Sequence, residues 1–311
     1  MDKFDFRKAK QNKKDEFYTQ LSDIENELKN YKSHFKGKTV FCNCDDPEWS
    51  NFTLYFAQNF EHLELKRLIS TGYDQDGTAI VLDLSEDLNG DGKIDHKDLF
   101  DAARMLYSDG DFRSEESIEL LKQADIVVTN PPFSLFREYI SQLMEYNKKF
   151  LIIGNMNAVG CKEIFPLVKE NKIWLGVTGF NKGMYFRVPD DFEYSPSYKF
   201  EKEINGEKVG RVSGISWFTN MEHHRRNEDV LLYKKYTIEE YPKYDNFDAI
   251  EVGIYTDIPC DYDGVMGVPI TFVDKYNPSQ FQIVGFRKGD DGKDLSVDGK
   301  SKYLRILIKK K

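Results

Sequence analysis

The residues with the clearest chemical potential are an asparagine, a pair of prolines and a phenylalanine near the middle of the chain. Asn130-Pro131-Pro132-Phe133 directly follows the apolar run Ala124–Thr129, a pattern that predicts a buried strand ending in a rigid loop. Because proline has no backbone N–H, the carbonyls beside it lack partners in a strand ladder. An amide, a free carbonyl and an aromatic face at a strand end suit a flat group that carries an amine. We therefore predict a binding loop in which the amine donates to Asn130 and to the Pro131 carbonyl while its ring stacks on Phe133.

The surrounding sequence predicts the elements that would position this loop. Short apolar runs predict strands over residues 38–42, 65–70, 78–84, 150–154 and 172–177. Helices are predicted over residues 19–35, 51–60 and 114–123 and from Ser134 onward, with Ser114 and Ser134 as N-caps and Ser22-x-x-Glu25 as a capping box. Strands that alternate with helices indicate an open, doubly wound parallel sheet of the α/β class. Ligands of such sheets bind beyond the carboxyl ends of the strands, where both Asn130 and the acidic turn Asp45-Asp46 would lie.

The character of the sequence changes along the chain. Residues 1–14 form a basic arm, residues 15–178 carry the alternating pattern of the core, and residues 179–311 contain short, aromatic, turn-rich segments. We expect this mixed α+β remainder to complete the sheet and to add a recognition lobe.

Composition excludes several classes of protein. The 311 residues are 40% apolar and 31% charged, as in ordinary soluble domains. No apolar run reaches membrane-spanning length, and the charged N-terminus lacks the apolar core of a signal peptide, so we expect a cytoplasmic protein. The cysteines at 42, 44, 161 and 260 do not show the paired spacing of a metal site.

Several segments of the chain resemble the EcoRI-type adenine-specific DNA methyltransferases. They are Asp15–Thr19, Phe41–Pro47, Gly110–Ser114, Asn130–Phe133 and Met266–Ile270. The resemblance implies a Rossmann-like methyltransferase sheet, S-adenosylmethionine as cofactor, duplex DNA as partner and a bacterial or phage origin. It also implies that the target adenine is flipped out of the duplex, so that its exocyclic amine attacks the sulfonium methyl group. A cognate restriction endonuclease is a further possible partner.

The same resemblance assigns residues to the cofactor, namely Tyr18, Thr19, Asn43, Asp45, Asp46 and Asp111. The turn after the first strand departs from the commoner methyltransferase pattern, because Asn43-Cys44-Asp45-Asp46-Pro47 stands where a glycine-rich turn is usual. A carboxylate at a strand end can bind ribose hydroxyls or an ammonium group, and either aspartate of this turn could do so. Without the resemblance, Tyr18-Thr19 would predict the start of a helix.

Binding to DNA has to be reconciled with a net charge of −9. The candidates for phosphate contacts are the lysines of the N-terminal arm and a basic cluster, His223, His224, Arg225 and Arg226. We expect base-reading residues within 180–210 and 250–290, with Tyr185 and Arg187 as candidates.

Two other functions fit parts of the same pattern. Methyltransferases that act on RNA adenine or on a protein glutamine also use Asn-Pro-Pro-aromatic loops, because a planar amide resembles the edge of adenine. A non-catalytic DNA-binding or calcium-binding module is the second alternative, and an intact Asn130 argues against it.

The segment Asp87–Asp98 matches a calcium-binding loop position by position. Side-chain oxygens at Asp87, Asn89, Asp91, Asp95 and Asp98, a backbone carbonyl at Lys93 and a central Gly92 make up the pattern. Asp98 replaces the usual final glutamate, which shortens the reach of that ligand. We predict a weak, structural calcium site, followed by a helix over residues 98–103.

Overall fold

The computed structural model describes residues 18–44, 47–48, 50–74, 79–179, 184–187, 201–204, 207–212, 214–287 and 294–311. The chain forms two compact units, residues 1–156 with 178–221 and residues 157–177 with 222–311. The chain therefore passes between units at three points, whereas the sequence suggested a single change of character near residue 178. The N-terminal arm and Asp45-Asp46 lie outside the described residues.

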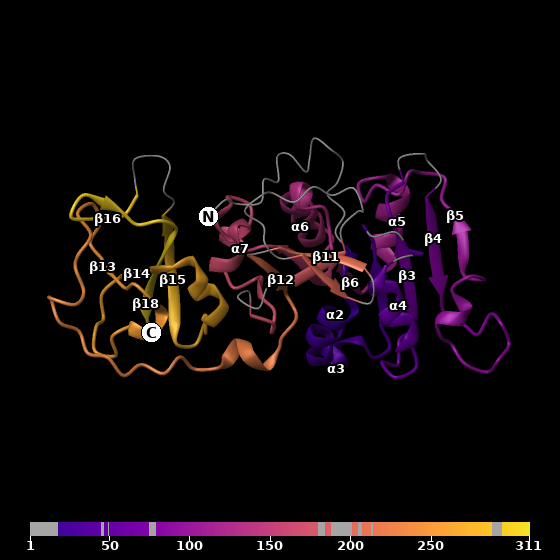
Figure 1. Cartoon of the computed structure of the whole chain (residues 1–311), viewed down its shortest axis with the longest axis horizontal. Helices are drawn as coiled ribbons and strands as arrows, with labels where there is room; N and C mark the ends of the chain where they lie inside the picture. Colours follow the sequence, from indigo (N-terminus) through magenta and orange to yellow (C-terminus); the bar gives the residue numbers. More distant parts are fainter. Residues whose placement is uncertain are drawn as a thin grey trace. The chain divides into compact units, whose positions relative to one another are not determined.

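The main sheet of the first unit has four parallel strands at its centre (Figure 1). These are β3 (Arg67–Thr71), β2 (Thr39–Cys42), β6 (Ile126–Thr129) and β7 (Lys149–Asn155). The antiparallel strands β4 (Ile80–Leu84) and β5 (Ala103–Met105) extend it beyond β3, and β12 (Ile215–Thr219) pairs antiparallel with β7. The prediction of a Rossmann-like α/β sheet is confirmed, but the sheet is mixed. A short connection cannot cross over to a parallel neighbour, so β4 turns back along β3.

Helices pack on this sheet through buried apolar side chains. They are α2 (Leu21–Leu28), η1 (Lys29–Tyr31), α3 (Lys32–Phe35), α4 (Asn51–Gln58), α5 (Glu115–Gln123) and α6 (Phe136–Glu145). Ser114 caps α5 as predicted, and Ser50 caps α4 by accepting from the N–H groups of Phe52 and Thr53.

Three local predictions about helices are wrong. Gln20, not Ser22, is the N-cap of α2, and it makes no side-chain cap. Ser134 lies inside the 3-10 turn η3 (Phe133–Leu135), which the proline pair leads into, so α6 begins only at Phe136. No helix follows Asp98, because η2 (His96–Asp98) leads through turns directly into β5.

A second sheet of the first unit joins the start of the chain to the segment after residue 178. Its order is β1 (Tyr18–Thr19), β9 (Met184–Arg187), β11 (Glu207–Val212) and β10 (Glu201–Ile204). Tyr18 pairs with Arg187 and Thr19 with Phe186, so the helix start expected from these two residues alone is wrong. The side chains of Tyr185 and Arg187 are outside what the structure describes.

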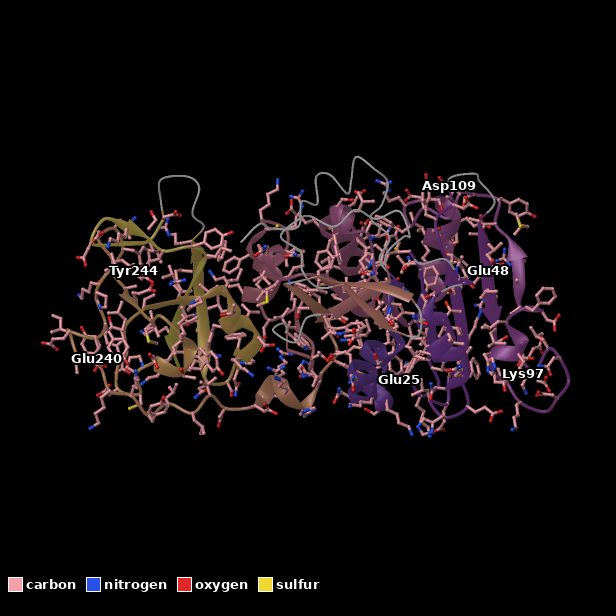
Figure 2. The ribbon with its side chains drawn as sticks, in the orientation of Figure 1. Glu25, Glu48, Lys97, Asp109, Glu240 and Tyr244 are labelled. Atoms are coloured by element: carbon pink, nitrogen blue, oxygen red, sulfur yellow. The ribbon has the colours of Figure 1, made fainter. Side chains whose placement is uncertain are left out.

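The second unit is built on its own sheet, in the order β13 (Ile250–Glu251), β14 (Met266–Pro269), β18 (Arg305–Lys310) and β15 (Phe281–Arg287). Its other elements are α7 (Phe165–Lys169), β8 (Trp174–Leu175), η6 (His224–Asn227), η7 (Tyr255–Asp257), η8 (Ile270–Lys275), β16 (Ser296–Val297) and β17 (Lys300–Ser301). Tyr244, labelled in Figure 2, donates its buried hydroxyl to Glu251, which also pairs with Arg305 at 2.6 Å. Of the strand predicted over 172–177, only β8 forms.

Among the residues that the structure describes, no helix is both long and apolar enough to cross a lipid bilayer.

Candidate active site

The Asn130–Phe133 loop and the turn that begins at Asn43 leave neighbouring parallel strands on the same edge of the main sheet. β2 and β6 pair in parallel, with Phe41 opposite Val127, so Asn43 and Asn130 both follow the carboxyl ends of their strands. β3 ends at Thr71 on the same edge, and β7 at Asn155. We call this edge the carboxyl rim. Asn130 and Asn43 therefore share one edge, while Asp45 and Asp46, for which the same edge was predicted, lie outside the described residues.

The Asn130–Phe133 loop is closely packed. Asn130 is 7% exposed, Pro131 is buried, and Pro132 and Phe133 are half-buried. Behind the loop, α6 packs so closely on β7 that a Cβ at Gly154 would lie 2.3 Å from the ring of Phe136. Any residue larger than glycine at position 154 would push α6 and the loop outward. Half-burial leaves part of the Phe133 ring accessible, as a stacking partner has to be.

Asn43, the first residue of the turn after β2, accepts two buried hydrogen bonds. Thr129 donates its hydroxyl to the backbone carbonyl of Asn43, and Tyr139 donates its hydroxyl to Asn43 Oδ1. Burial raises the pKa of Tyr139 well above its usual range, so this hydroxyl stays protonated and remains a donor. The side-chain oxygen of Asn43 is thus used inside the protein.

Two buried hydroxyls near the rim have no hydrogen-bond partner among the described residues, those of Thr19 and Thr71. Thr19 precedes α2, and its carbonyl accepts from Asn51 Nδ2 at 2.7 Å at the start of α4. Thr71 is the last residue of β3. A buried hydroxyl without a partner is unfavourable unless a ligand completes it. This donor set fits the hydroxyls and polar groups of S-adenosylmethionine. Sequence reasoning missed Thr71, although its place at the end of a predicted strand could have indicated it.

Asp111, predicted to contact the cofactor's adenine, already accepts hydrogen bonds from Arg113. Its two carboxylate oxygens accept from Arg113 Nε at 2.9 Å and Nη2 at 2.6 Å. The hydrogen bond from Arg113 holds the pKa of Asp111 below its ordinary value, so the group is ionised at neutral pH. The loop itself is pinned to the rim, because a Cβ at Gly110 would lie 2.0 Å from the carbonyl oxygen of Gly72 and Asp74 N donates to Asp109 O at 2.9 Å. Asp111 can still accept an amine, but only beside a guanidinium.

The structure does not test the remaining cofactor predictions. Asp45 and Asp46 lie outside the described residues, and of Tyr18 only the backbone is described.

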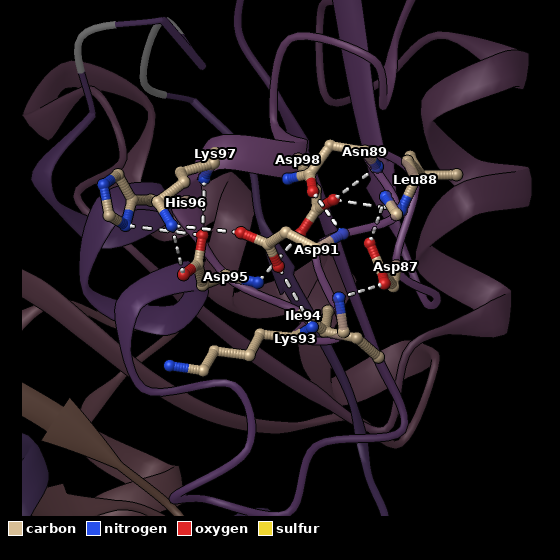
Figure 3. A network of polar contacts seen from close by, with 12 residues as sticks. Asp87, Leu88, Asn89, Asp91, Lys93, Ile94, Asp95, His96, Lys97 and Asp98 are labelled. Atoms are coloured by element: carbon tan, nitrogen blue, oxygen red, sulfur yellow. Dashed lines mark hydrogen bonds and ion pairs between the residues drawn. The ribbon is translucent and has the colours of Figure 1, made fainter.

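The 87–98 loop uses its carboxylates on its own backbone (Figure 3). Asp98 is fully buried and accepts from the N–H groups of Leu88, Asn89 and Asp95 at 2.9, 3.0 and 2.9 Å. Asp87 accepts from Gly90 and Gly92, both at 2.7 Å. Lys93 donates its N–H to Asp91 Oδ1 at 3.1 Å, and the ammonium of Lys97 lies 3.0 Å from Asp91 Oδ2. Within the described part of the chain, no three Asp, Glu, His or Cys side chains are gathered as a metal ion would require.

The basic cluster predicted to bind phosphate is largely internal to the second unit. His223 is buried, with Nε2 2.9 Å from the carbonyl oxygen of Leu175. Arg225 donates to Asp274 at 2.7 Å and to the carbonyl of Val177.

Arg226, the last of the cluster, is buried with its guanidinium 3.3 Å from the ring centroid of Trp174, where it also pairs with Glu222 and Asn171. Burial lowers the pKa of Arg226. Only His224 is exposed. We therefore correct the prediction: residues 223–226 hold the second unit together and do not present four phosphate contacts.

Comparison with known proteins identifies the family. A family model described as the adenine-specific methyltransferase EcoRI matches residues 5–311. The chain belongs to this family. It is 52% identical over 315 residues to the Type II methyltransferase M.EcoRI of Escherichia coli, covering 98% of this chain and 95% of the relative. It is 40% identical over 326 residues to the Type II methyltransferase M.MpnI of Mycoplasma pneumoniae, covering 98% of each chain. Membership confirms the predicted enzyme class, an S-adenosylmethionine-dependent, adenine-specific methyltransferase.

Proposed function

We propose that this chain transfers the methyl group of S-adenosylmethionine to the exocyclic amine of adenine within a short site of duplex DNA. The observation that carries the proposal is the carboxyl rim, where Asn130 and the Asn43 turn leave adjacent parallel strands. Family membership supplies the adenine-specific class, and the rim supplies the residues that would carry out the reaction.

The rim residues have distinct roles in this proposal. The target adenine is flipped out of the duplex, and its amine donates to the Asn130 side-chain oxygen and to the Pro131 carbonyl. Two acceptors on one amine direct its lone pair away from the ring, toward the methyl carbon. Phe133 stacks on the base and Pro132 fixes the loop. The reaction needs no protein nucleophile, because positioning and electrostatics lower its barrier.

The cofactor residues proposed here combine the resemblance with the structure. When bound, S-adenosylmethionine supplies an electrophilic methyl group on a sulfonium. Thr19 and Thr71 offer hydroxyls to its polar groups, the Asn43 amide nitrogen donates, and Asp111 accepts from its adenine amine. As nitrogen bonds to the methyl carbon and the carbon–sulfur bond breaks, the amine becomes cationic and then loses one proton to solvent.

A single labelling experiment tests this function against the alternatives. The protein is incubated with methyl-labelled cofactor and, separately, with duplex DNA of mixed sequence, RNA and a protein extract. We expect label in DNA alone, lost in Asn130→Ala and retained in Asn26→Ala, an exposed asparagine on α2. Label in RNA or protein but not in DNA would replace the proposal with one of the other amine methyltransferases.

Because the relatives are named Type II methyltransferases, we also propose that this chain has a partner restriction endonuclease. DNA modified by this chain should resist cleavage by a restriction endonuclease that recognises the same site. Methylation-sensitive sequencing of DNA from cells that express the chain would identify that site.

We also propose that the 87–98 loop binds calcium only weakly and only after its side chains rearrange. The spacing of oxygen side chains supports binding, but a cation would have to displace Lys97 from Asp91 and compete with backbone N–H groups for Asp87 and Asp98. Calorimetry should find a dissociation constant of about a millimolar or weaker. Heat of binding at micromolar calcium would show that the loop is a dedicated site.

A further inference from the structure

A buried tyrosine connects the helix that follows the catalytic loop to the turn that faces the cofactor. Tyr139 lies on α6, is fully buried, and packs edge-on against Phe112 with ring centroids 5.0 Å apart at 85°. Its hydroxyl donates to Asn43 Oδ1, directly after the end of β2. α6 starts at Phe136, immediately beyond the Asn130–Phe133 loop. The hydroxyl therefore links the two halves of the active site.

The residue after Asn43 is held in a conformation that its type disfavours. Cys44 has φ +75°, in the left-handed region that favours glycine. For a residue with a Cβ, this conformation costs on the order of 1–2 kcal/mol and persists only where neighbouring contacts enforce it. Here the neighbouring contacts are those to Asn43, whose carbonyl accepts from Thr129 and whose side chain accepts from Tyr139.

We propose that Tyr139 is a positioning residue for methyl transfer: its hydroxyl holds the strained Asn43-Cys44 turn in the shape that binds S-adenosylmethionine. This inference rests on the proposed function, because it assigns the turn to the cofactor. A glycine at position 44 would adopt the positive φ without strain, whereas Cys44 is kept there by the hydrogen bonds from Tyr139 and Thr129 to Asn43. Tyr139 is not a catalytic residue, since its hydroxyl is fully occupied inside the protein.

The first test is Tyr139→Phe, which removes the hydroxyl and keeps the ring packed against Phe112. Losing one buried hydrogen bond should raise the KM for S-adenosylmethionine about tenfold. The kcat and the dissociation constant for DNA should stay within about threefold, because the close packing of Phe136 on Gly154 also positions the Asn130 loop. The matched control is Tyr241→Phe, which removes another buried tyrosine hydroxyl that donates to the carbonyl of Asp257 at 2.8 Å. This control should leave the KM unchanged.

The second test distinguishes positioning from general stability. Cys44→Gly removes the backbone penalty at φ +75°, so in the Tyr139→Phe background it should return the KM to within about threefold of the wild-type value. Cys44→Ala keeps a Cβ in the same conformation, so in the Tyr139→Phe background it should leave the KM raised. Equal behaviour of the glycine and alanine variants, or an unchanged KM in Tyr139→Phe, would overturn the proposal.

Two further outcomes keep the inference separate from the proposed function. If Tyr139→Phe does not fold, Asn43→Ala removes the same hydrogen bond from the acceptor side and must raise the KM or dissociation constant for S-adenosylmethionine at least about tenfold, because it also removes the amide nitrogen proposed to donate to the cofactor. An unchanged value in this variant would also overturn the proposal. If the wild-type protein methylates no DNA, the proposed function fails. Calorimetric binding of S-adenosylmethionine to the same variants then still decides whether Tyr139 supports a cofactor turn.

Discussion

The carboxyl rim and the 87–98 loop are both rich in polar side chains, yet they use them in opposite ways. In the loop, Asp87, Asp91 and Asp98 accept from backbone N–H groups of the same loop, and Lys97 neutralises part of the charge. At the rim, the hydroxyls of Thr19 and Thr71 are buried without partners among the described residues. The polar groups of the loop are hydrogen-bonded within the loop, whereas the two hydroxyls at the rim can be satisfied by a ligand.

The two regions also lie at opposite ends of the sheet. β4 runs antiparallel to β3, with Leu84 opposite Leu68 and Val81 opposite Thr71, so the loop that follows β4 lies beside the amino-terminal end of β3. In Figure 2 the labelled Lys97 of the loop and Asp109 of the rim lie at opposite ends of these strands. A five-residue strand spans roughly 15 Å. A cation in the loop could therefore stabilise the fold without touching the substrates.

The largest expected effect is at the rim itself. Asn130→Ala removes the proposed acceptor for the target amine and should lower kcat about a thousandfold, because the lost interaction acts in the transition state. S-adenosylmethionine binding should change less than about threefold. Single-turnover methylation and calorimetry measure the two quantities. A variant that methylates DNA at a wild-type rate would remove Asn130 from the mechanism.

The loop should respond to mutation in stability and not in activity. Asp98→Asn places an NH₂ group against backbone N–H donors and should lower the free energy of unfolding by about 1–3 kcal/mol, measured by urea denaturation. Burial raises the pKa of Asp98, but the backbone donors outweigh it and the net pKa is lowered. The exposed Asp101→Asn is the control and should change nothing. A fall in kcat without a fall in stability would place the loop in the reaction.

Thr71 provides a test in which stability and binding should separate. Thr71→Val removes a hydroxyl that has no partner among the described residues, so unfolding should be unaffected or slightly harder, while the KM for S-adenosylmethionine rises about five- to tenfold. Thr53→Val is a matched control, because its hydroxyl lies 2.6 Å from that of Ser70. It should lower stability and leave the KM alone. If Thr71→Val, like Thr53→Val, lowers stability and leaves the KM for S-adenosylmethionine unchanged, the Thr71 hydroxyl does not bind the cofactor.

The smallest effect concerns the pH dependence of the Asp111–Arg113 pair. The hydrogen bond from Arg113 lowers the pKa of Asp111 in the folded state, so its contribution to stability is present above the unfolded pKa of about 4 and is lost as pH falls through the folded pKa. Arg113→Gln should therefore be less stable than wild type by under about 1 kcal/mol at neutral pH, since the arginine is half-exposed. Urea denaturation across acid pH should show the difference disappearing as Asp111 protonates. If the two proteins still differ in free energy of unfolding at the lowest pH, the difference comes from the packing of Arg113 and not from its ion pair with Asp111.

The sequence predicted the rim far better than the surfaces around it. Apolar runs ending at Cys42 and Thr129 are local signals, and parallel pairing then brings Asn43 and Asn130 to one edge. Thr71 and Tyr139 were missed because their roles depend on which atoms lack or find partners in three dimensions. Arg225 and Arg226 were misassigned because charge in a sequence does not reveal burial against Asp274 or Trp174. The calcium pattern shows the same limit, since its spacing is also that of a loop that folds on its own carboxylates.

The central claim is that the protein methylates adenine in DNA with the residues at the carboxyl rim. Its most direct test is to treat duplex DNA with the protein and S-adenosylmethionine, digest it to nucleosides and identify the methylated product by mass spectrometry, for wild type and Asn130→Ala. The account predicts N6-methyl-2′-deoxyadenosine from the wild type and almost none from Asn130→Ala. Methylated deoxycytidine, or equal yields of methyladenine from the two proteins, would contradict it.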